Sequence, residues 1–334
     1  MTMLLTRKVL LPLLAALTYQ VEVPEGPPPP PPRTRLVLGG DVMLSRNVAR
    51  LARQKGDPAA PFRDLAAVFA GAGIAFVNLE APFSDRGPVM QRGMIFKTEP
   101  EMIAGLELAG IDVVSTANNH ARDRGAYGLD YTLDWLREHR IAAVGTGKTV
   151  EEAHAGAVLE RNGTRFGFLA YTYDANNGNY PPGDLEQRVA VLDLDAMRAD
   201  VAAMQARADV IVVSMHAGFE YVPEPNAQQR EFARAAIDAG ARVVVGHHPH
   251  VRQTWERYQD GVIFYSLGNL VFDQFQRRET QRGLLAEVVF DGSTLVRAGV
   301  LEVEIVRSVP RLAGVTRAPV SPDDAGGSAV AETP

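Results

Sequence analysis

Three of the chain's seven histidines lie within four consecutive positions, directly after a short run of β-branched residues. Residues 243–245 are typical of a buried strand that ends at Gly246. His247, His248 and His250 then fall on the loop beyond it, and ligands of open α/β sheets bind at that carboxyl-terminal edge. A surface turn that happens to be rich in histidine is the alternative. Because clustered imidazoles are a specific indication of metal binding, we favour a metal site.

The proline in this cluster predicts how the imidazoles point. Pro249 biases His248 toward an extended conformation. Residues two apart in an extended segment point the same way, so His248 and His250 are expected to face one metal. The same alternation turns His247 away, which predicts a supporting role for it.

Other predicted strands also end in side chains that could bind a metal. The strands are 35–39, 74–79, 111–116 and 209–215, and the side chains at their ends are Asp41, Asn78, Glu80, Asn119, His120 and His216. Asp41 could instead cap a helix over 42–51, and Asn119 could belong to a turn. So many polar strand ends are hard to attribute to turns alone, and we expect these side chains to meet at one edge of a sheet.

Helical patterns alternate with these strands and predict an α/β domain. Helices are expected over 62–70, 100–109, 127–139, 150–155, 194–204 and 227–239. A hairpin is expected around Asn162-Gly163, and an antiparallel pair over 283–290 and 295–306 predicts a β-rich C-terminal part. His139 and His154 lie on the predicted helices and are expected to be structural, the latter without a partner.

Composition excludes several classes of protein. A net charge of −6 argues against a nucleic-acid binder that uses a general basic surface. The absence of cysteine excludes disulfides, thiolate metal sites and cysteine nucleophiles. With 46% hydrophobic and 22% charged residues, the chain has the composition of a soluble globular protein.

The two ends of the chain differ from its middle. Residues 1–20 combine a basic start with a short apolar core, which predicts a signal peptide or a short anchor. Residues 21–33 contain six consecutive prolines and are expected to form an extended linker. Residues 34–317 are expected to form the folded domain and residues 318–334 a disordered tail. The leader predicts an exported or membrane-associated protein of the cell envelope. A cytoplasmic protein remains the alternative if the leader is an artefact.

Six motifs in order carry a family resemblance over residues 35–290. They are Gly40-Asp41-Val42-Met43-Leu44, Asn78-Leu79-Glu80, Asn118-Asn119-His120 with Asp123-x-Gly125, His216-x-Gly218-x-Glu220-Tyr221, Gly246-His247-His248-Pro249-His250-Val251-x-Gln253 and Tyr265-Ser266-Leu267-Gly268-Asn269. This order resembles the CapA family of capsule and poly-γ-glutamate synthesis proteins, within the calcineurin-like metallophosphoesterases. The resemblance implies a metallophosphoesterase-like layered α/β sandwich in the cell envelope.

The resemblance also implies a centre of one or two divalent ions. The residues at the matching positions are Asp41, Glu80, Asn119, His216, His248 and His250. Their oxygen and nitrogen atoms suit Mn²⁺, Zn²⁺, Fe or Mg²⁺. The superfamily usually opens with Asp-x-His, but here Met43 takes the histidine's place. Asn78 and Glu80 replace a bridging aspartate, so we expect one metal position to be weakened.

If the centre is catalytic, the neighbouring residues have roles. His120, paired with Asp123, would be the general acid for the leaving group. Arg46 and Arg124 could bind an anionic substrate, although solvated surface positions are as probable for them. Side chains expected to support the metal ligands or the floor of the site are Asn78, Glu220, Tyr221 and Asn269.

Two functions follow. The first is an exported metal-dependent hydrolase acting on a phosphoester, or on the amide of an anionic envelope polymer such as polyglutamate. The second is a non-catalytic accessory subunit of a polymer synthesis or export complex. A cytosolic phosphodiesterase survives only if the leader is an artefact. The asparagine-rich segment 175–183 could overhang the site, but a plain surface loop is favoured.

Overall fold

The computed structural model describes residues 32–86, 94–173 and 186–314. The predicted leader, nearly all of the linker, the tail and the segment 175–183 lie outside these residues and stay predictions. Within the described part of the chain, no helix combines the length and the apolar character needed to cross a membrane.

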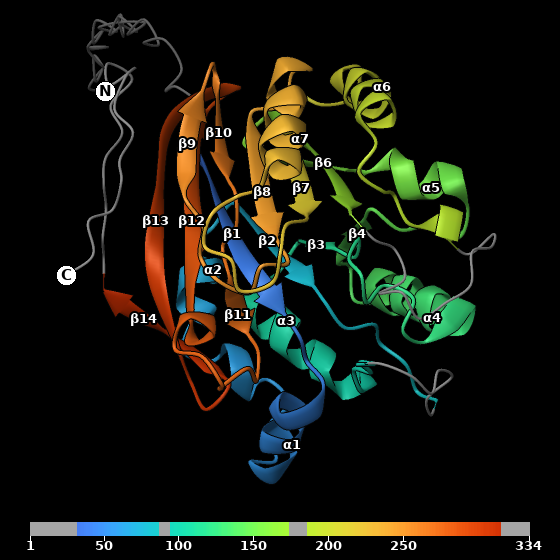
Figure 1. The fold of residues 1–334 in the computed structure, drawn as a ribbon, viewed down its shortest axis with the longest axis vertical. Coiled ribbons are helices and arrows are strands. Elements are labelled where there is room, and N and C mark those ends of the chain that lie inside the picture. Colours follow the sequence, from blue (N-terminus) through green and yellow to red (C-terminus); the bar gives the residue numbers. More distant parts are fainter. Residues whose placement is uncertain (1–31, 87–93, 174–185, 315–334) are drawn as a thin grey trace, which may run out of the picture. The chain divides into compact units, whose positions relative to one another are not determined.

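Two β-sheets form the centre of the folded unit (Figure 1). The first has the order β14-β13-β12-β1-β2-β3-β4, with β11 also paired to β1, and the second has the order β5-β6-β7-β8-β10-β9. The first sheet consists of β1 (Thr34–Val42), β2 (Ile74–Leu79), β3 (Val113–Ser115), β4 (Ala142–Val144), β11 (Asn269–Val271), β12 (Arg282–Asp291), β13 (Thr294–Val306) and β14 (Val309–Gly314). The second consists of β5 (Ala157–Arg161), β6 (Thr164–Thr172), β7 (Val210–His216), β8 (Val243–His247), β9 (Trp255–Tyr258) and β10 (Gly261–Phe264).

Helices cover the outer faces of both sheets. They are α1 (Arg46–Gln54), α2 (Ala66–Ala70), α3 (Ile103–Ala109), α4 (Gly125–Glu138), α5 (Val150–Ala155), α6 (Leu194–Gln205) and α7 (Ala227–Asp238), with 3₁₀ turns at Ala60–Phe62, Pro100–Met102, Glu186–Arg188 and Glu279–Gln281. Helices α1 to α4 share a hydrophobic core with the first sheet, and α6 and α7 share one with the second. The fold is therefore a four-layer α/β sandwich.

Strand alternation in β1 shows how the layers arise from the sequence. Leu36 and Leu38 point into the core between the two sheets, where they join Phe76 and Phe168. Val37, between them, points into the core under the helices. Because successive strand residues face opposite sides, a continuous apolar run is what a strand buried on both faces requires. Each such side chain contributes about 1.5–3 kcal/mol by burial.

Two glycines allow the strand ends to approach closely where the candidate site begins. A Cβ at Gly40 would lie 1.9 Å from the carbonyl oxygen of Gly268, and one at Gly246 would lie 1.9 Å from that of Tyr265. The close approach lets the amide of Asp41 donate to the Gly268 carbonyl at 3.0 Å. The ends of β1 and β8 are thereby fixed just before the first polar side chains.

The structure changes some of the expected boundaries. β1 continues to Val42 and α1 begins at Arg46 with Ser45 as its N-cap, so Asp41 does not cap a helix. The helix expected over 62–70 is a 3₁₀ turn followed by the short α2. The edge strands β9 and β14 were not expected, because their half-exposed sequences lack a continuous apolar run.

Candidate metal centre

The carboxyl ends of the strands bring the polar side chains of both sheets together. Asp41 comes from β1, Asn78 and Glu80 from β2, Asn119 and His120 from the turn after β3, His216 from β7, and His247, His248 and His250 from β8 and its loop. All of these residues are buried, none more than 5% exposed. The gathering expected from the sequence is therefore present in the structure.

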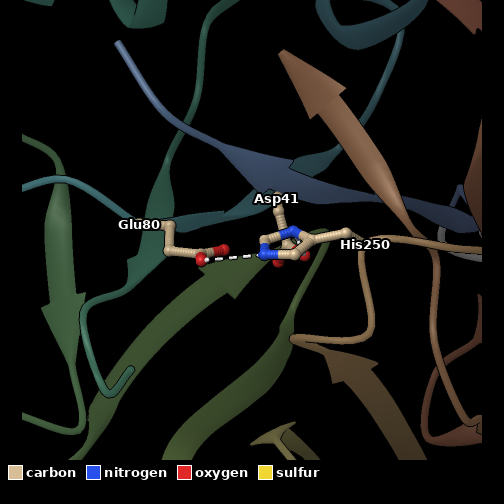
Figure 2. Close-up of side chains that lie close together, drawn as sticks. All are labelled: Asp41, Glu80 and His250. Atoms are coloured by element: carbon tan, nitrogen blue, oxygen red, sulfur yellow. Dashed lines mark ion pairs between the residues drawn. The ribbon is translucent and has the colours of Figure 1, made fainter. Parts of the chain in front are cut away.

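Asp41, Glu80 and His250 form the tightest group. One ligand atom from each lies within 4.8 Å of the others. His250 Nδ1 is 3.5 Å from Asp41 Oδ2, and His250 Nε2 is 3.6 Å from Glu80 Oε1. Figure 2 shows the two carboxylates and the imidazole converging on one point. This arrangement is a candidate site for a metal ion.

The pKa values of the two carboxylates in this group are shifted in opposite directions. Burial alone would raise the pKa of Asp41, but the imidazoles of His247 and His250, whose Nδ1 atoms lie 3.4 and 3.5 Å from its carboxylate oxygens, hold this pKa well below its usual value. Burial raises the pKa of Glu80 well above its usual value, and the nearby charges of Asp41 and Glu220 raise it further. Two buried carboxylates this close disfavour each other's ionised form, and a bound cation would stabilise both charges.

A second group of side chains lies beside the first. His216 Nε2 is 2.9 Å from Asn119 Oδ1, and the His216 and His248 rings are 4.9 Å apart. Burial lowers the pKa of His216, and burial together with the charge of His250 lowers the pKa of His248 to about 3. Both imidazoles are thus neutral near pH 7, which is the form that binds a metal.

Asn78 joins the two groups. Its Nδ2 donates to Asp41 Oδ1 at 2.8 Å and to Glu80 Oε2 at 3.4 Å, and it lies 3.3 Å from His216 Nδ1. Asn118 in turn donates to Asn78 Oδ1 at 3.3 Å. Asn78 thus orients candidate ligands from both sheets at once.

Several buried polar atoms here have no hydrogen-bond partner in the described chain. They are Glu80 Oε1, both ring nitrogens of His247 and Nδ1 of His248. An unsatisfied buried polar atom costs about 1–3 kcal/mol, so such atoms are rare unless something else binds them. A divalent cation would accept their lone pairs, and this mixed oxygen and nitrogen set fits the metals expected from the sequence.

The histidine loop differs from the extended segment that the proline suggested. His248 and His250 have φ values of 96° and 59°, in the left-handed region. His247 is the last residue of β8, and its Nδ1 lies 3.4 Å from Asp41 Oδ1. The prediction that His247 turns away was therefore wrong, because strand alternation does not continue beyond β8. His247 becomes a further candidate ligand, and its place in the cluster was the sequence feature that could have revealed it.

His120 and Asp123 form a pair next to this cluster. His120 Nδ1 lies 2.7 Å from Asp123 Oδ2, which also accepts the Phe96 amide at 2.6 Å. The Phe96 ring stacks on the imidazole with centroids 4.0 Å apart. With the carboxylate on Nδ1 and an aromatic ring on its face, the imidazole has one defined orientation.

The remaining candidates lie around the cluster. Arg46 forms an ion pair with Asp273, and Arg124 is buried and donates to the carbonyl of Arg86 at 2.7 Å. Asn269 Oδ1 lies 3.0 Å from His250 Nδ1, which places it where it can orient that ring.

Glu220 and Tyr221 follow His216 on the next loop. Glu220 is exposed, whereas Tyr221 is half-buried, with its ring 6.3 Å from that of His250. Burial and the neighbouring Glu220 raise the pKa of Tyr221 to about 12.

Met43 is turned away from the cluster. Its side chain is fully buried in the core between the first sheet and its helices, and its sulfur accepts the Ser45 amide at 3.2 Å. This position therefore supplies no ligand to the centre.

The layers and the buried cluster define a layered α/β sandwich with polar side chains gathered at the strand ends. Among solved structures, a hypothetical protein from Thermus thermophilus superposes with a TM-score of 0.51 at 18% identity over 81% of this chain and 99% of the other. The NAD nucleotidase of Haemophilus influenzae gives 0.50 at 11% identity over 84% of this chain and 50% of the other. The predicted layered α/β sandwich is confirmed.

The family follows from sequence comparison. The sequence model of the protein family described as bacterial capsule synthesis protein PGA_cap matches residues 35–274. The chain belongs to this family. The PGA biosynthesis protein CapA of Bacillus subtilis is 32% identical over 74% of this chain and 65% of its own length. The capsule biosynthesis protein CapA of Bacillus anthracis is 30% identical over 78% of this chain and 65% of its own. The chain thus spans just under two thirds of these relatives.

Proposed function

We propose that this protein is a metal-dependent hydrolase of the cell envelope that acts in capsule or poly-γ-glutamate synthesis. Its substrate would be a phosphoester or a γ-glutamyl amide. The observation that carries the proposal is the His120–Asp123 pair beside the buried cluster. This pair differs from His154–Asp200 and His139–Glu107 in its place beside the candidate ligands, where an oriented imidazole can exchange a proton with a bound substrate.

The candidate ligands have a defined task in this reaction. Asp41, Glu80 and His250 would hold the metal together with Asn119, His216 and His248. His247, whose ring nitrogens have no hydrogen-bond partner in the described chain, adds to this set. A divalent ion held by these residues would lower the pKa of a water molecule and polarise the scissile group. Burial of the whole set keeps bulk water away and strengthens these interactions.

His120 would handle the proton. Asp123 accepts the Nδ1 hydrogen and so keeps Nε2 as the nitrogen that exchanges a proton with the leaving group. Phe96, stacked on the ring, limits its rotation. Arg46 and Arg124 remain candidates for binding an anionic substrate.

An accessory role is the second candidate function. A relative from Mycobacterium tuberculosis, 26% identical over 71% of this chain and 74% of its own length, is called a probable polyglutamine synthesis accessory protein. Met43, in place of the expected histidine, also favours it, because that position lacks a ligand. In this role the metal would stabilise a surface that a polymer synthesis or export complex binds.

A matched pair of variants tests the proposal. Full-length protein is loaded with Mn²⁺ or Zn²⁺ and assayed on an aryl phosphodiester and on poly-γ-glutamate. His120→Asn should lower turnover by about 10²–10⁴-fold with metal content unchanged, since general acid catalysis contributes that much. His139→Asn is the control, because His139 pairs with Glu107 outside the cluster. Full metal content without turnover on either substrate would favour the accessory role.

A further inference from the structure

The loop after β11 brings Arg277 to the edge of the metal centre. Its guanidinium carbon lies 4.8 Å from the centroid of the Tyr221 ring. The Tyr221 ring in turn lies 6.3 Å from the His250 ring. One aromatic ring therefore separates this cation from a candidate metal ligand, and cation–π attraction favours that position.

A chain of hydrogen bonds fixes Tyr221 relative to the centre. His250 Nδ1 is 3.0 Å from Asn269 Oδ1, and Asn269 Nδ2 donates to Gln274 Oε1 at 3.1 Å. Gln274 Nε2 then donates to the Tyr221 hydroxyl at 3.3 Å. The Tyr221 amide also donates to the carbonyl of Pro249, inside the histidine loop, at 2.8 Å. The ring that carries Arg277 is thus tied to the metal centre through side chains and backbone.

Thr280 holds the Arg277 loop itself. Its buried hydroxyl lies 2.9 Å from the carbonyl oxygens of both Gln274 and Arg277. Asn269 Nδ2 donates to the Thr280 carbonyl at 2.9 Å. The loop therefore needs little further ordering when a ligand binds, which lowers the entropy cost of binding.

The charge of Arg277 is available, unlike those of the two arginines that the sequence suggested. Arg46 is neutralised by Asp273, and Arg124 is buried. Arg277 is exposed, and within the described chain no carboxylate forms an ion pair with it. A guanidinium in this state is suited to bind a carboxylate or phosphate through two parallel hydrogen bonds.

Each of the two loops also carries an exposed phenylalanine near these residues in the sequence. Phe219 is 64% exposed and lies two residues before Tyr221, and Phe275 is 42% exposed and lies two residues before Arg277. Exposed rings on the two loops that carry Tyr221 and Arg277 suit a ligand with anionic groups on apolar stems.

We propose that Arg277, positioned by Tyr221, binds a second anionic group of the substrate while the scissile bond lies at the metal centre. The site would thus select a substrate that repeats carboxylate or phosphate groups along a chain. This inference rests on the proposed function of the same centre. It assigns Arg277 to recognition of the substrate and gives it no part in the bond-breaking step.

Binding to a protein without turnover tests this role separately from hydrolysis. Full-length His120→Asn protein loaded with Mn²⁺ is titrated with a γ-linked glutamate oligomer and with the matching isoglutamine oligomer, in which the side carboxylates are amides. Adding Arg277→Ala should weaken binding of the glutamate oligomer about three- to tenfold at low salt and leave binding of the isoglutamine oligomer unaffected. Arg277→Lys should recover part of the loss, because the charge returns without the planar fork. Arg278→Ala, which changes the next exposed arginine, is the matched control.

Each outcome decides the inference. Selective loss in Arg277→Ala that decreases as salt is added supports it, even if the wild-type protein shows no turnover, which would overturn only the hydrolase proposal. Equal weakening of both oligomers, an equal loss in Arg278→Ala, or no preference of the parent protein for the glutamate oligomer overturns it. Unchanged Mn²⁺ content in all variants excludes an indirect effect on the metal centre.

Discussion

The metal centre and the pair formed by His154 of α5 and Asp200 of α6 both place an imidazole against a buried or half-buried carboxylate. At the pair, His154 Nδ1 lies 2.7 Å from Asp200 Oδ2, and the Tyr171 hydroxyl donates to the same oxygen at 2.9 Å. One carboxylate there meets one imidazole and one hydroxyl. At the centre, two carboxylates meet several imidazoles, and four buried ligand atoms have no hydrogen-bond partner in the described chain.

The difference shows what separates a structural histidine from a candidate ligand. The expectation that His154 has no partner was wrong, yet its structural role stays the simplest interpretation, because its polar contacts are made within the protein. At the centre, the four atoms that lack a hydrogen-bond partner among the described residues are oxygen and nitrogen atoms that a cation could bind. The same type of substitution at the metal centre and at the His154–Asp200 pair should therefore have different effects.

The largest effect is expected on metal affinity. Asp41→Asn removes the negative charge of the carboxylate that His247 and His250 both contact. It should weaken Mn²⁺ or Zn²⁺ binding by at least about 100-fold, a larger loss than removal of a hydrogen bond to a metal ligand causes. Asp200→Asn, the same change at the structural pair, should leave affinity unchanged. Titration calorimetry measures both. Equal losses in the two variants would contradict the distinction.

A smaller effect is expected on stability. Metal at 100 times its dissociation constant should raise the free energy of unfolding by about 2.7 kcal/mol, because it binds only the folded state. This gain should disappear in Asp41→Asn and persist in Asp200→Asn. Chemical denaturation with and without metal provides the measurement, and a gain of the same size in Asp41→Asn would mean that the ion binds elsewhere.

The smallest effect is a pH dependence at the structural pair. The hydrogen bond to Asp200 raises the pKa of His154 above its usual 6.5, although burial opposes this. The stabilisation from this pair is therefore complete at pH values below the pKa that His154 has in the unfolded chain. It is lost as the pH rises through the raised pKa of His154 in the folded protein. The stability difference between wild type and His154→Asn should be under about 1 kcal/mol, and larger near pH 5.5 than near pH 9. Unfolding curves at the two pH values should show this, and a difference that grows with pH would refute it.

Much of the fold could be predicted because strand and helix periods differ. β2 has the predicted bounds, and the hairpin turn at Asn162 and Gly163 adopts the expected positive φ values. The edge strands β9 and β14 could not be predicted, since a half-exposed strand has little apolar pattern. The break in the helix between Phe62 and Ala66 was also missed. A 3₁₀ turn followed by a short helix can bury apolar residues at the same sequence positions as one continuous helix.

For the site, the sequence predicted which side chains meet but not how they point. The carboxyl ends of strands in both sheets converge whatever the rotamers, so Asp41, Glu80 and His250 could be grouped from their places after strands. The orientation of His247 depends on where β8 ends and on two left-handed residues after it. Arg277 was missed because its position depends on contacts between loops distant in the sequence.

Anomalous X-ray diffraction from crystals of the full-length protein grown with Mn²⁺ or Zn²⁺ is the most direct test of the metal centre. The expected result is a peak about 2.0–2.3 Å from oxygen or nitrogen atoms of Asp41, Glu80 and His250. A second peak about 3.5–4 Å away would favour hydrolysis. A protein that binds no ion there, or binds one only at a distant surface site, would contradict the assignment of this cluster as a metal centre.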